Sequence, residues 1–341
     1  MIKVGIWGYG GIASIHRRSY AALEEAGVPV KLVALCDIRE EQFTREIKIN
    51  ISTGDEKPLP KIDKCYTDID EMLANEELDM IDICLPAYMH KDAAIKCLKA
   101  GYHVLSEKPM ALSYADCCEM IETAKTAKGK LLIGQCLRHD LNYNVLKEAV
   151  DSGKYGKVIN ANFHRLSGGP VWAWENWYMD VNKSGGVNFD LHIHDIDMTN
   201  YLFGTPKTVT CFNTGNADKF SGRDTAFTTF TYDNGLVVSG HGDWCQPGKY
   251  QFSYRYTITF ENATLEFKDY KLTKITEDGY EDITVPDTYH NIAKEIRAFV
   301  EAIENGTEVE CAPVESTANT LKILEFMMES SNAGGKMVEF K

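Results

Sequence analysis

The stretch that decides the fold is residues 2–13, Ile2-Lys3-Val4-Gly5-Ile6-Trp7-Gly8-Tyr9-Gly10-Gly11-Ile12-Ala13. An apolar run typical of a buried strand leads directly into a glycine cluster, and a helical pattern follows from about Ile12 to Glu24. The cluster fits G-x-G-x-x-A, in which Gly8 permits a tight turn and Gly10 lets the backbone approach a pyrophosphate. The helix N-terminus beyond it offers N–H groups to an anion. We therefore predict that Gly8, Gly10, Gly11 and Ile12 bind a dinucleotide.

Strand and helix patterns alternate outward from this stretch through the first half of the chain. Further apolar strand runs occur at 30–36, 80–85, 102–106 and 130–135, with helical patterns between them. Continuous apolar strands separated by helices predict a parallel sheet that is covered on both faces. The segment 51–64 is rich in Pro, Lys and Asp, and we expect it to be a surface loop.

The second half is dominated by strand patterns joined by tight turns. Asp233-Asn234-Gly235 separates the strand runs 226–232 and 236–242, which is typical of a β-hairpin. Helical patterns at 292–304 and 314–330 close the chain. The predicted fold is α/β, with an N-terminal Rossmann domain (a doubly wound parallel sheet) over 1–125. An α+β domain with a large, mainly antiparallel open sheet follows over 126–341, and its C-terminal helices are able to pack back on the first domain.

Composition and charge exclude several classes of function. The 341 residues carry a formal net charge of −14, which disfavours binding to nucleic acids and to anionic membranes. No signal peptide pattern and no run of about twenty apolar residues is visible. The ten cysteines are scattered without a C-x-x-C pair, so we expect reduced thiols in a cytoplasmic protein and no metal site.

Asp37 ends the second strand pattern, where a carboxylate can accept hydrogen bonds from both ribose hydroxyls. This position favours NAD and repels the additional phosphate of NADP, although NADP is not excluded; a plain helix cap is the alternative. Arg39 can stack on adenine, pair with a phosphate or remain solvated. The sequence does not choose among these interpretations.

Glu107-Lys108-Pro109 follows a strand pattern, at the sheet edge where ligands of parallel sheets bind. The proline keeps Lys108 extended, so its ammonium can project toward a nicotinamide and serve as a proton donor or acceptor. Together with the glycine turn, Leu85-Pro86 with His90, Gly134-Gln135 with Arg138, and Ser184-Gly185-Gly186 with Asp190 and His194, this stretch resembles the Gfo/Idh/MocA oxidoreductase family.

The resemblance covers nearly the whole chain and implies roles for its residues. Lys108 would be the catalytic lysine; Pro86, His90 and Glu107 would line the nicotinamide and ribose pocket; and Arg138 would lie near the substrate. Asp190 and His194 would complete the catalytic group. The family also implies a sugar, inositol or related polyol as substrate, and a homodimer or homotetramer.

The second candidate site lies in Asp190-Leu191-His192-Ile193-His194. In a helix, Asp190 and His194 share one face, and the carboxylate would orient the imidazole and raise its basicity. His192 and His194 also spell H-x-H, a zinc-ligand pattern on strands, but residues two apart in a helix diverge. Trp177, in an aromatic-rich loop, is either a wall against a sugar ring or a structural anchor. His164 is a further candidate substrate contact.

These patterns predict an NAD(P)-dependent dehydrogenase acting on CH–OH groups. Hydride would move between nicotinamide and a secondary alcohol, while Lys108 and His194 handle the hydroxyl proton. Two alternatives stay open at this point. One is a glycosidase that retains its NAD and oxidises its substrate transiently; the other is a non-catalytic NAD(P)-binding sensor.

Overall fold

The structure, a computed structural model, describes residues 1–44, 61–171, 173–216 and 220–340. The chain divides into two compact units. The first comprises residues 1–111, 115–139 and 288–318, and the second comprises 112–114, 140–287 and 319–341. Most of the loop predicted at 51–64 lies outside the described residues. Among those described, no helix is long and apolar enough to cross a membrane.

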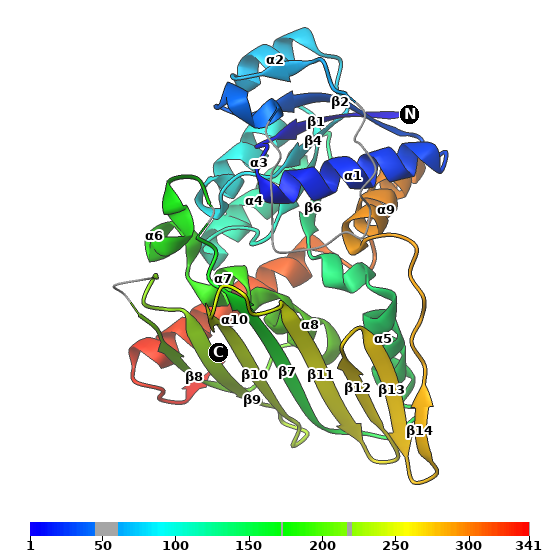
Figure 1. The fold of residues 1–341 in the computed structure, drawn as a ribbon, viewed down its shortest axis with the longest axis vertical. Helices are drawn as coiled ribbons and strands as arrows, with labels where there is room; N and C mark the ends of the chain where they lie inside the picture. Colours follow the sequence, from blue (N-terminus) through cyan, green and yellow to red (C-terminus); the bar gives the residue numbers. More distant parts are fainter. Residues whose placement is uncertain (45–60, 172, 217–219, 341) are drawn as a thin grey trace. The chain divides into compact units, whose positions relative to one another are not determined.

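The first unit is built on a parallel sheet with the strand order β3-β2-β1-β4-β5-β6 (Figure 1). This is the Rossmann order, in which ligands bind at the carboxyl ends of the strands beside the β1–β4 switch point. Its elements are β1 (Ile2–Trp7), α1 (Gly11–Glu25), β2 (Val30–Cys36), η1 (Glu40–Phe43), β3 (Cys65–Tyr66), α2 (Ile69–Asn75), β4 (Met80–Ile83), η2 (Ala87–Met89), α3 (His90–Lys99), β5 (His103–Glu107), α4 (Tyr114–Thr126), β6 (Leu131–Gly134), η3 (Cys136–His139) and α9 (Asn291–Asn305).

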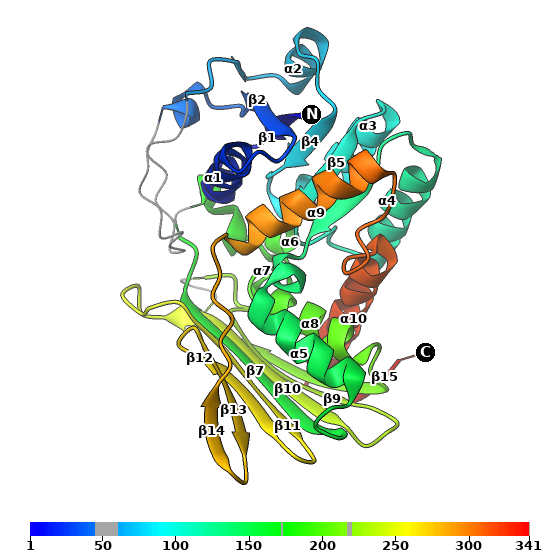
Figure 2. The same cartoon turned by 90° about the vertical axis from the view of Figure 1, so that its right-hand side faces the viewer.

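Strands of this sheet are buried along their whole length, as expected where helices cover both faces. Met80 to Ile83 of the central strand β4 and Leu131 to Gly134 of the edge strand β6 are buried throughout. The helix α9, although it comes from the end of the chain, packs against α1 through Ile292, Ile296 and Phe299 (Figure 2). The predicted parallel sheet is therefore confirmed.

The predicted domain boundary between 125 and 126 falls too early. β6 pairs in parallel with β5, so the strand after residue 126 completes the Rossmann sheet, and the first unit continues to His139. The sequence allowed the C-terminal helices to pack back on the first domain, and α9 does so. The helix α10 (Val314–Asn332) begins in the first unit and continues in the second.

The second unit contains a sheet with the order β14-β13-β12-β11-β7-β10-β9-β8-β15, in which β7 and β10 are parallel and the other described neighbours are antiparallel. Its elements are α5 (Leu141–Ser152), β7 (Val158–Gly168), η4 (Trp174–Met179), α6 (Val181–Ser184), α7 (Val187–Asp190), α8 (Ile193–Phe203), β8 (Thr208–Thr214), β9 (Thr225–Thr231), β10 (Val237–Gln246), β11 (Ser253–Phe260), β12 (Thr264–Lys268), β13 (Lys271–Thr276), β14 (Gly279–Asp282) and β15 (Val338–Glu339).

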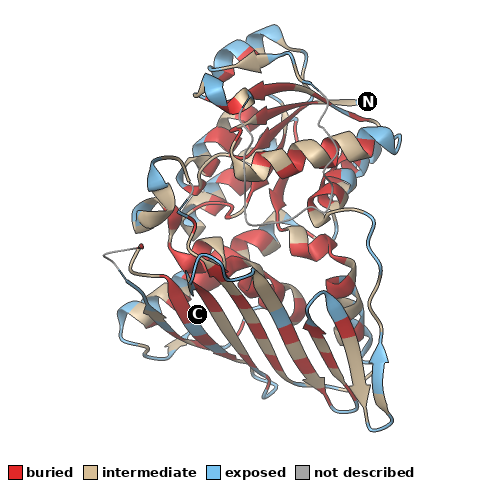
Figure 3. Cartoon of the chain, viewed as in Figure 1, coloured by how far each residue is buried: buried red, intermediate tan, exposed pale blue. Residues whose placement is uncertain are grey.

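Buried and less buried residues alternate along the strands of this second sheet (Figure 3). In β7, Ala161, Phe163 and Arg165 are buried, whereas the residues between them are partly exposed. The helices α7 and α8 pack against the face with the buried residues. Period-two burial explains why the sequence shows alternating strands here and continuous apolar strands in the first unit.

Candidate active site

The glycine turn between β1 and α1 has the geometry that a pyrophosphate requires. Gly8 has a φ of 92°, and a Cβ there would lie 2.7 Å from the Cys84 carbonyl oxygen, so a side chain does not fit. A Cβ on Gly10, by contrast, would meet no atom within 4 Å. Gly10 is the N-cap of α1 and provides no side-chain cap, so the first-turn N–H groups are available to an anion. Gly11 and Ile12 begin the helix, as the sequence predicted.

Asp37 lies directly after β2 and is tied to this turn. Its Oδ2 accepts the Tyr9 N–H at 2.8 Å, and its Oδ1 accepts the Arg39 N–H at 2.9 Å. The Arg39 Nε lies 3.5 Å from the same Oδ1. Each carboxylate oxygen has a second lone pair. Asp37 can therefore hold the turn and still accept a hydrogen bond from a ribose hydroxyl.

The turns after β4 and β5 are joined by His90. The ring nitrogens of this buried imidazole lie 2.7 Å from the Pro109 carbonyl oxygen and 2.8 Å from the Leu85 carbonyl oxygen. Burial lowers the pKa of His90, and the two carbonyl acceptors offset only part of that effect. His90 thus fixes the backbone on both sides of Pro86 and Lys108, and Lys108 itself is half-buried at the end of β5.

Glu107, the last residue of β5, is buried and supports Lys108. Its Oε2 accepts the Lys108 N–H at 3.0 Å, and its Oε1 lies 3.0 Å from Nε2 of His16. Sequence analysis missed His16. The available signal was a histidine in the first helix of a dinucleotide-binding pattern, on the helix face that packs on the sheet.

The Arg138 side chain is buried within the first unit and hydrogen-bonded there. Its side chain is 1% exposed, and its guanidinium donates hydrogen bonds to the Cys311 carbonyl and to the Ser316 hydroxyl, both at 3.1 Å. These bonds connect η3 with the segment that follows α9. That Arg138 contacts substrate stays a prediction, and the observed bonds support a role in packing.

In the second unit, Asp190 ends α7 and His194 lies in the first turn of α8. The two residues between these helices, Leu191 and His192, keep right-handed helical dihedral angles, so Asp190 and His194 are one turn apart. Both are half-buried. The local arrangement matches the helical spacing on which the predicted acid–imidazole pair depends, while its catalytic role stays a prediction.

His192 belongs to a separate buried cluster with Asp195 and Arg165. The His192 Nδ1 lies 3.3 Å from Asp195, and the Arg165 guanidinium donates to the same carboxylate at 2.9 Å. A Cβ on Gly242 would lie 2.6 Å from the His192 Cβ, so this strand glycine makes room for the imidazole. The H-x-H pattern therefore places one histidine in a packed ion cluster and the other at a half-buried position. Sequence analysis missed the cluster.

His164 lies on the other face of the second sheet from α8. Its neighbour Arg165 reaches Asp195 of α8, and successive strand residues point to opposite faces. The His164 ring packs edge-on against His241 at 6.0 Å. The substrate role of His164 stays a prediction.

Trp177 lies in η4 and stacks on Tyr178, with ring centroids 3.8 Å apart. Tyr178 in turn packs against the buried Trp244 at 6.3 Å. These contacts show how the loop is anchored. Trp177 itself is half-buried, and its substrate role stays a prediction.

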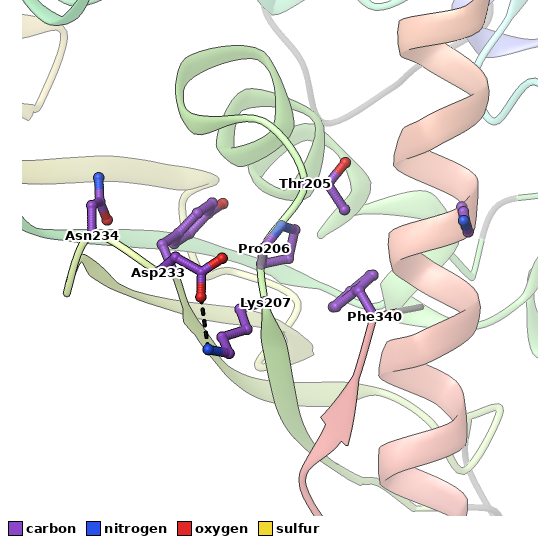
Figure 4. A pocket seen from close by; sticks show the side chains of 8 residues that line it. Thr205, Pro206, Lys207, Asp233, Asn234 and Phe340 are labelled. Carbon is purple, nitrogen blue, oxygen red and sulfur yellow. Dashed lines mark ion pairs between the residues drawn. The ribbon is translucent and has the colours of Figure 1, made fainter.

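A surface pocket in the second unit contains none of the predicted site residues (Figure 4). It is lined by the segment just before β8, the β9–β10 turn, α10 and the C-terminal segment. The Lys207 ammonium pairs with the Asp233 carboxylate there at 2.7 Å. We assign it no part in the chemistry.

Comparison with known proteins identifies the family to which the two units belong. A family model described as "Oxidoreductase family, NAD-binding Rossmann fold" matches residues 2–135, and the GFO/IDH/MocA C-terminal domain model matches residues 143–266. The chain belongs to the Gfo/Idh/MocA oxidoreductase family. The first model ends within the first unit and the second begins within the second, so both units of this Gfo/Idh/MocA protein are recognised separately.

Individual relatives agree with this membership. The chain is 33% identical to the myo-inositol 2-dehydrogenase of Thermotoga maritima over 60% of its own length and 55% of that protein's. It is 31% identical to the 2,7-anhydro-N-acetylneuraminate hydratase of Mediterraneibacter gnavus over 42% of the chain and 38% of that protein. The matches thus span about half the length of these relatives or less. The solved aldose-aldose oxidoreductase from Caulobacter crescentus has the same fold, with a TM-score of 0.84, 19% identity, and 99% of each chain covered.

Proposed function

We propose that this protein is an NAD-dependent dehydrogenase that interconverts a secondary alcohol and a ketone on a sugar, an inositol or a related polyol. The observation that carries the proposal is the open glycine turn, where Gly10 leaves space above uncapped N–H groups of α1. The name of the Thermotoga relative supports the substrate class. NAD is preferred in this proposal because the Asp37 carboxylate would repel a 2′-phosphate.

The chemistry divides between the cofactor and the side chains. When bound, the nicotinamide supplies the hydride acceptor or donor at C4. Lys108 and His194 would take the hydroxyl proton as the carbinol carbon loses hydride, and return it in the reverse direction. Asp190 would orient His194, and His90 with Glu107 would hold the backbone at Lys108. The principal base is either Lys108 or His194.

The test is a screen of inositols, aldoses and other polyols with NAD and with NADP, followed by the absorbance of reduced nicotinamide. The proposal expects reduction of NAD by at least one polyol, with a lower kcat/KM for NADP. If the folded protein binds neither nicotinamide cofactor, the proposal is wrong.

The hydratase relative favours a second candidate, a redox-neutral reaction through transient oxidation. A glycosidase that retains NAD is one form of this chemistry. The two candidates differ in their products, because the redox-neutral enzyme would convert its substrate without net NADH. Product analysis by mass spectrometry with a trace of NAD separates them.

We further propose that the protein forms a homodimer or homotetramer through the sheet face opposite α7 and α8. Phe212 and Phe227 are register partners on β8 and β9 and remain about half exposed, at 53% and 50%. His241 stacks on Phe227 with a centroid distance of 4.2 Å. Apolar side chains on a flat sheet face suit a self-complementary interface.

A reducing compartment such as the cytoplasm is the proposed location. All ten cysteines are free thiols, and five of them are buried.

A further inference from the structure

A chain of buried polar groups lies beneath the turn that carries Lys108. His16 of α1 places its Nδ1 2.7 Å from Asp82 of β4 and its Nε2 3.0 Å from Glu107 of β5. The Tyr20 hydroxyl donates to the same Asp82 oxygen at 2.9 Å. His16, Tyr20 and Asp82 are 0% exposed, and Glu107 is 6% exposed.

The partners of His16 determine its protonation. Ionised carboxylates only accept hydrogen bonds, so an imidazole between two of them satisfies both only when both ring nitrogens carry protons. Burial by itself would lower the pKa of His16, but the charge and hydrogen bond of Asp82 outweigh burial and raise it well above the ordinary value. The nearby Cys84 thiol stays neutral, because burial raises its pKa to about 12.

The same contact keeps Glu107 ionised. Burial by itself would raise the pKa of Glu107, but the hydrogen bond and charge of His16 outweigh it, with smaller contributions from Lys108 and His90, and the pKa is lowered. Ionised Glu107 carries a negative charge. That negative charge lies at the carboxyl end of β5, beside the Lys108 backbone.

We propose that His16 is a positioning residue that keeps Glu107 ionised and in place, so that the end of β5 favours the cationic, oxidised nicotinamide over the neutral, reduced one. This inference rests on the proposed function and extends it to a residue outside the cofactor contacts. The charge pattern supports it: Glu107 uses one oxygen for His16 and the other for the Lys108 N–H. Without the imidazolium, buried Glu107 would take up a proton and the negative charge would be lost.

The consequence can be measured without turnover. His16→Gln keeps a side chain that can hydrogen-bond but removes the positive charge. We expect its Kd for NAD⁺ to rise about tenfold relative to its Kd for NADH, because charges a few ångströms apart in a partly buried site interact by at least that factor. Glu107→Gln should likewise raise the ratio of the Kd for NAD⁺ to the Kd for NADH. Both dissociation constants are measured by calorimetry on the full chain.

Tyr20→Phe is the matched control. It removes a hydrogen bond from the same buried chain but leaves the contact between His16 and Glu107 intact. The ratio of its Kd for NAD⁺ to its Kd for NADH should equal that of the wild type, even if the free energy of unfolding of the variant is lower. A second readout is the imidazole nitrogen NMR spectrum of the cofactor-free wild type, in which His16 should be doubly protonated at a pH of about 7.

The outcomes separate this inference from the proposed function. If His16→Gln weakens NAD⁺ and NADH equally, or if the His16 ring is neutral at a pH of about 7, the inference is overturned while the dehydrogenase proposal stands. If the wild type binds neither cofactor, the proposed function fails, and the inference about cofactor preference fails with it even where the NMR spectrum shows an imidazolium.

Discussion

The ion cluster of Arg165, Asp195 and His192 should make a large contribution to the stability of the second unit. The Arg165 Nε lies 3.2 Å and 3.3 Å from the two oxygens of Asp195, and a terminal nitrogen lies 2.9 Å from Oδ1. The side chains of Arg165 and Asp195 are 3% and 2% exposed. Asp195→Asn leaves a buried guanidinium without its counter-charge, for which the expected loss is about 3–5 kcal/mol in the free energy of unfolding.

The pH dependence of this loss has a defined sign. Burial by itself would raise the pKa of Asp195, but Arg165, with His192, outweighs it and holds the pKa below the ordinary value. A carboxylate with a depressed pKa stabilises the fold fully above its unfolded pKa of about 3.9, and this stabilisation disappears as the pH falls through the folded pKa. The difference in the free energy of unfolding between wild type and Asp195→Asn should therefore be constant near neutral pH and become smaller below a pH of about 4.

Urea unfolding, followed by circular dichroism and by hydrogen exchange of the α8 segment, provides the measurement. Two controls isolate the buried charge. Asp233→Asn removes the exposed partner of Lys207 and should cost less than about 1 kcal/mol. The double variant Arg165→Met/Asp195→Leu removes both charges and should recover much of the loss. A loss below about 1 kcal/mol in Asp195→Asn would refute this reasoning.

Three further predictions concern the cofactor and the interface. Gly10→Ala should leave the melting temperature unchanged, since a Cβ meets nothing there, yet raise the Kd for NAD more than about tenfold in calorimetry. Asp37→Asn keeps one acceptor oxygen and loses the other, so it should fold with reduced stability but raise the kcat/KM ratio of NADP to NAD; an unchanged ratio would count against Asp37 as the discriminating group. Phe227→Glu should lower the mass found by light scattering to that of a monomer, and an unchanged mass would exclude this face as the interface.

The Rossmann unit could be predicted from sequence because its signals are local. The β1–turn–α1 stretch contains its own strand, its glycines and its helix start, and their geometry is the one that the pattern predicts. The hairpin at Asp233-Asn234-Gly235 is equally local, and β9 and β10 pair around it.

Features that depend on distant residues could not be predicted. His16 meets Glu107, a residue 91 positions away, and a single sequence contains no sign of that contact. The domain boundary was misplaced because the apolar run of β6 does not reveal which sheet it joins.

The central proposal is that Lys108, on the turn after β5, takes part with His194 in the proton transfer that accompanies hydride transfer with bound NAD. The most direct measurement is single-turnover formation of NADH by wild type and Lys108→Met with a substrate from the polyol screen, alongside the Kd for NAD of each protein. The account predicts that Lys108→Met binds NAD as wild type does but forms NADH at least about a hundredfold more slowly. NADH formation at the wild-type rate in Lys108→Met would contradict it.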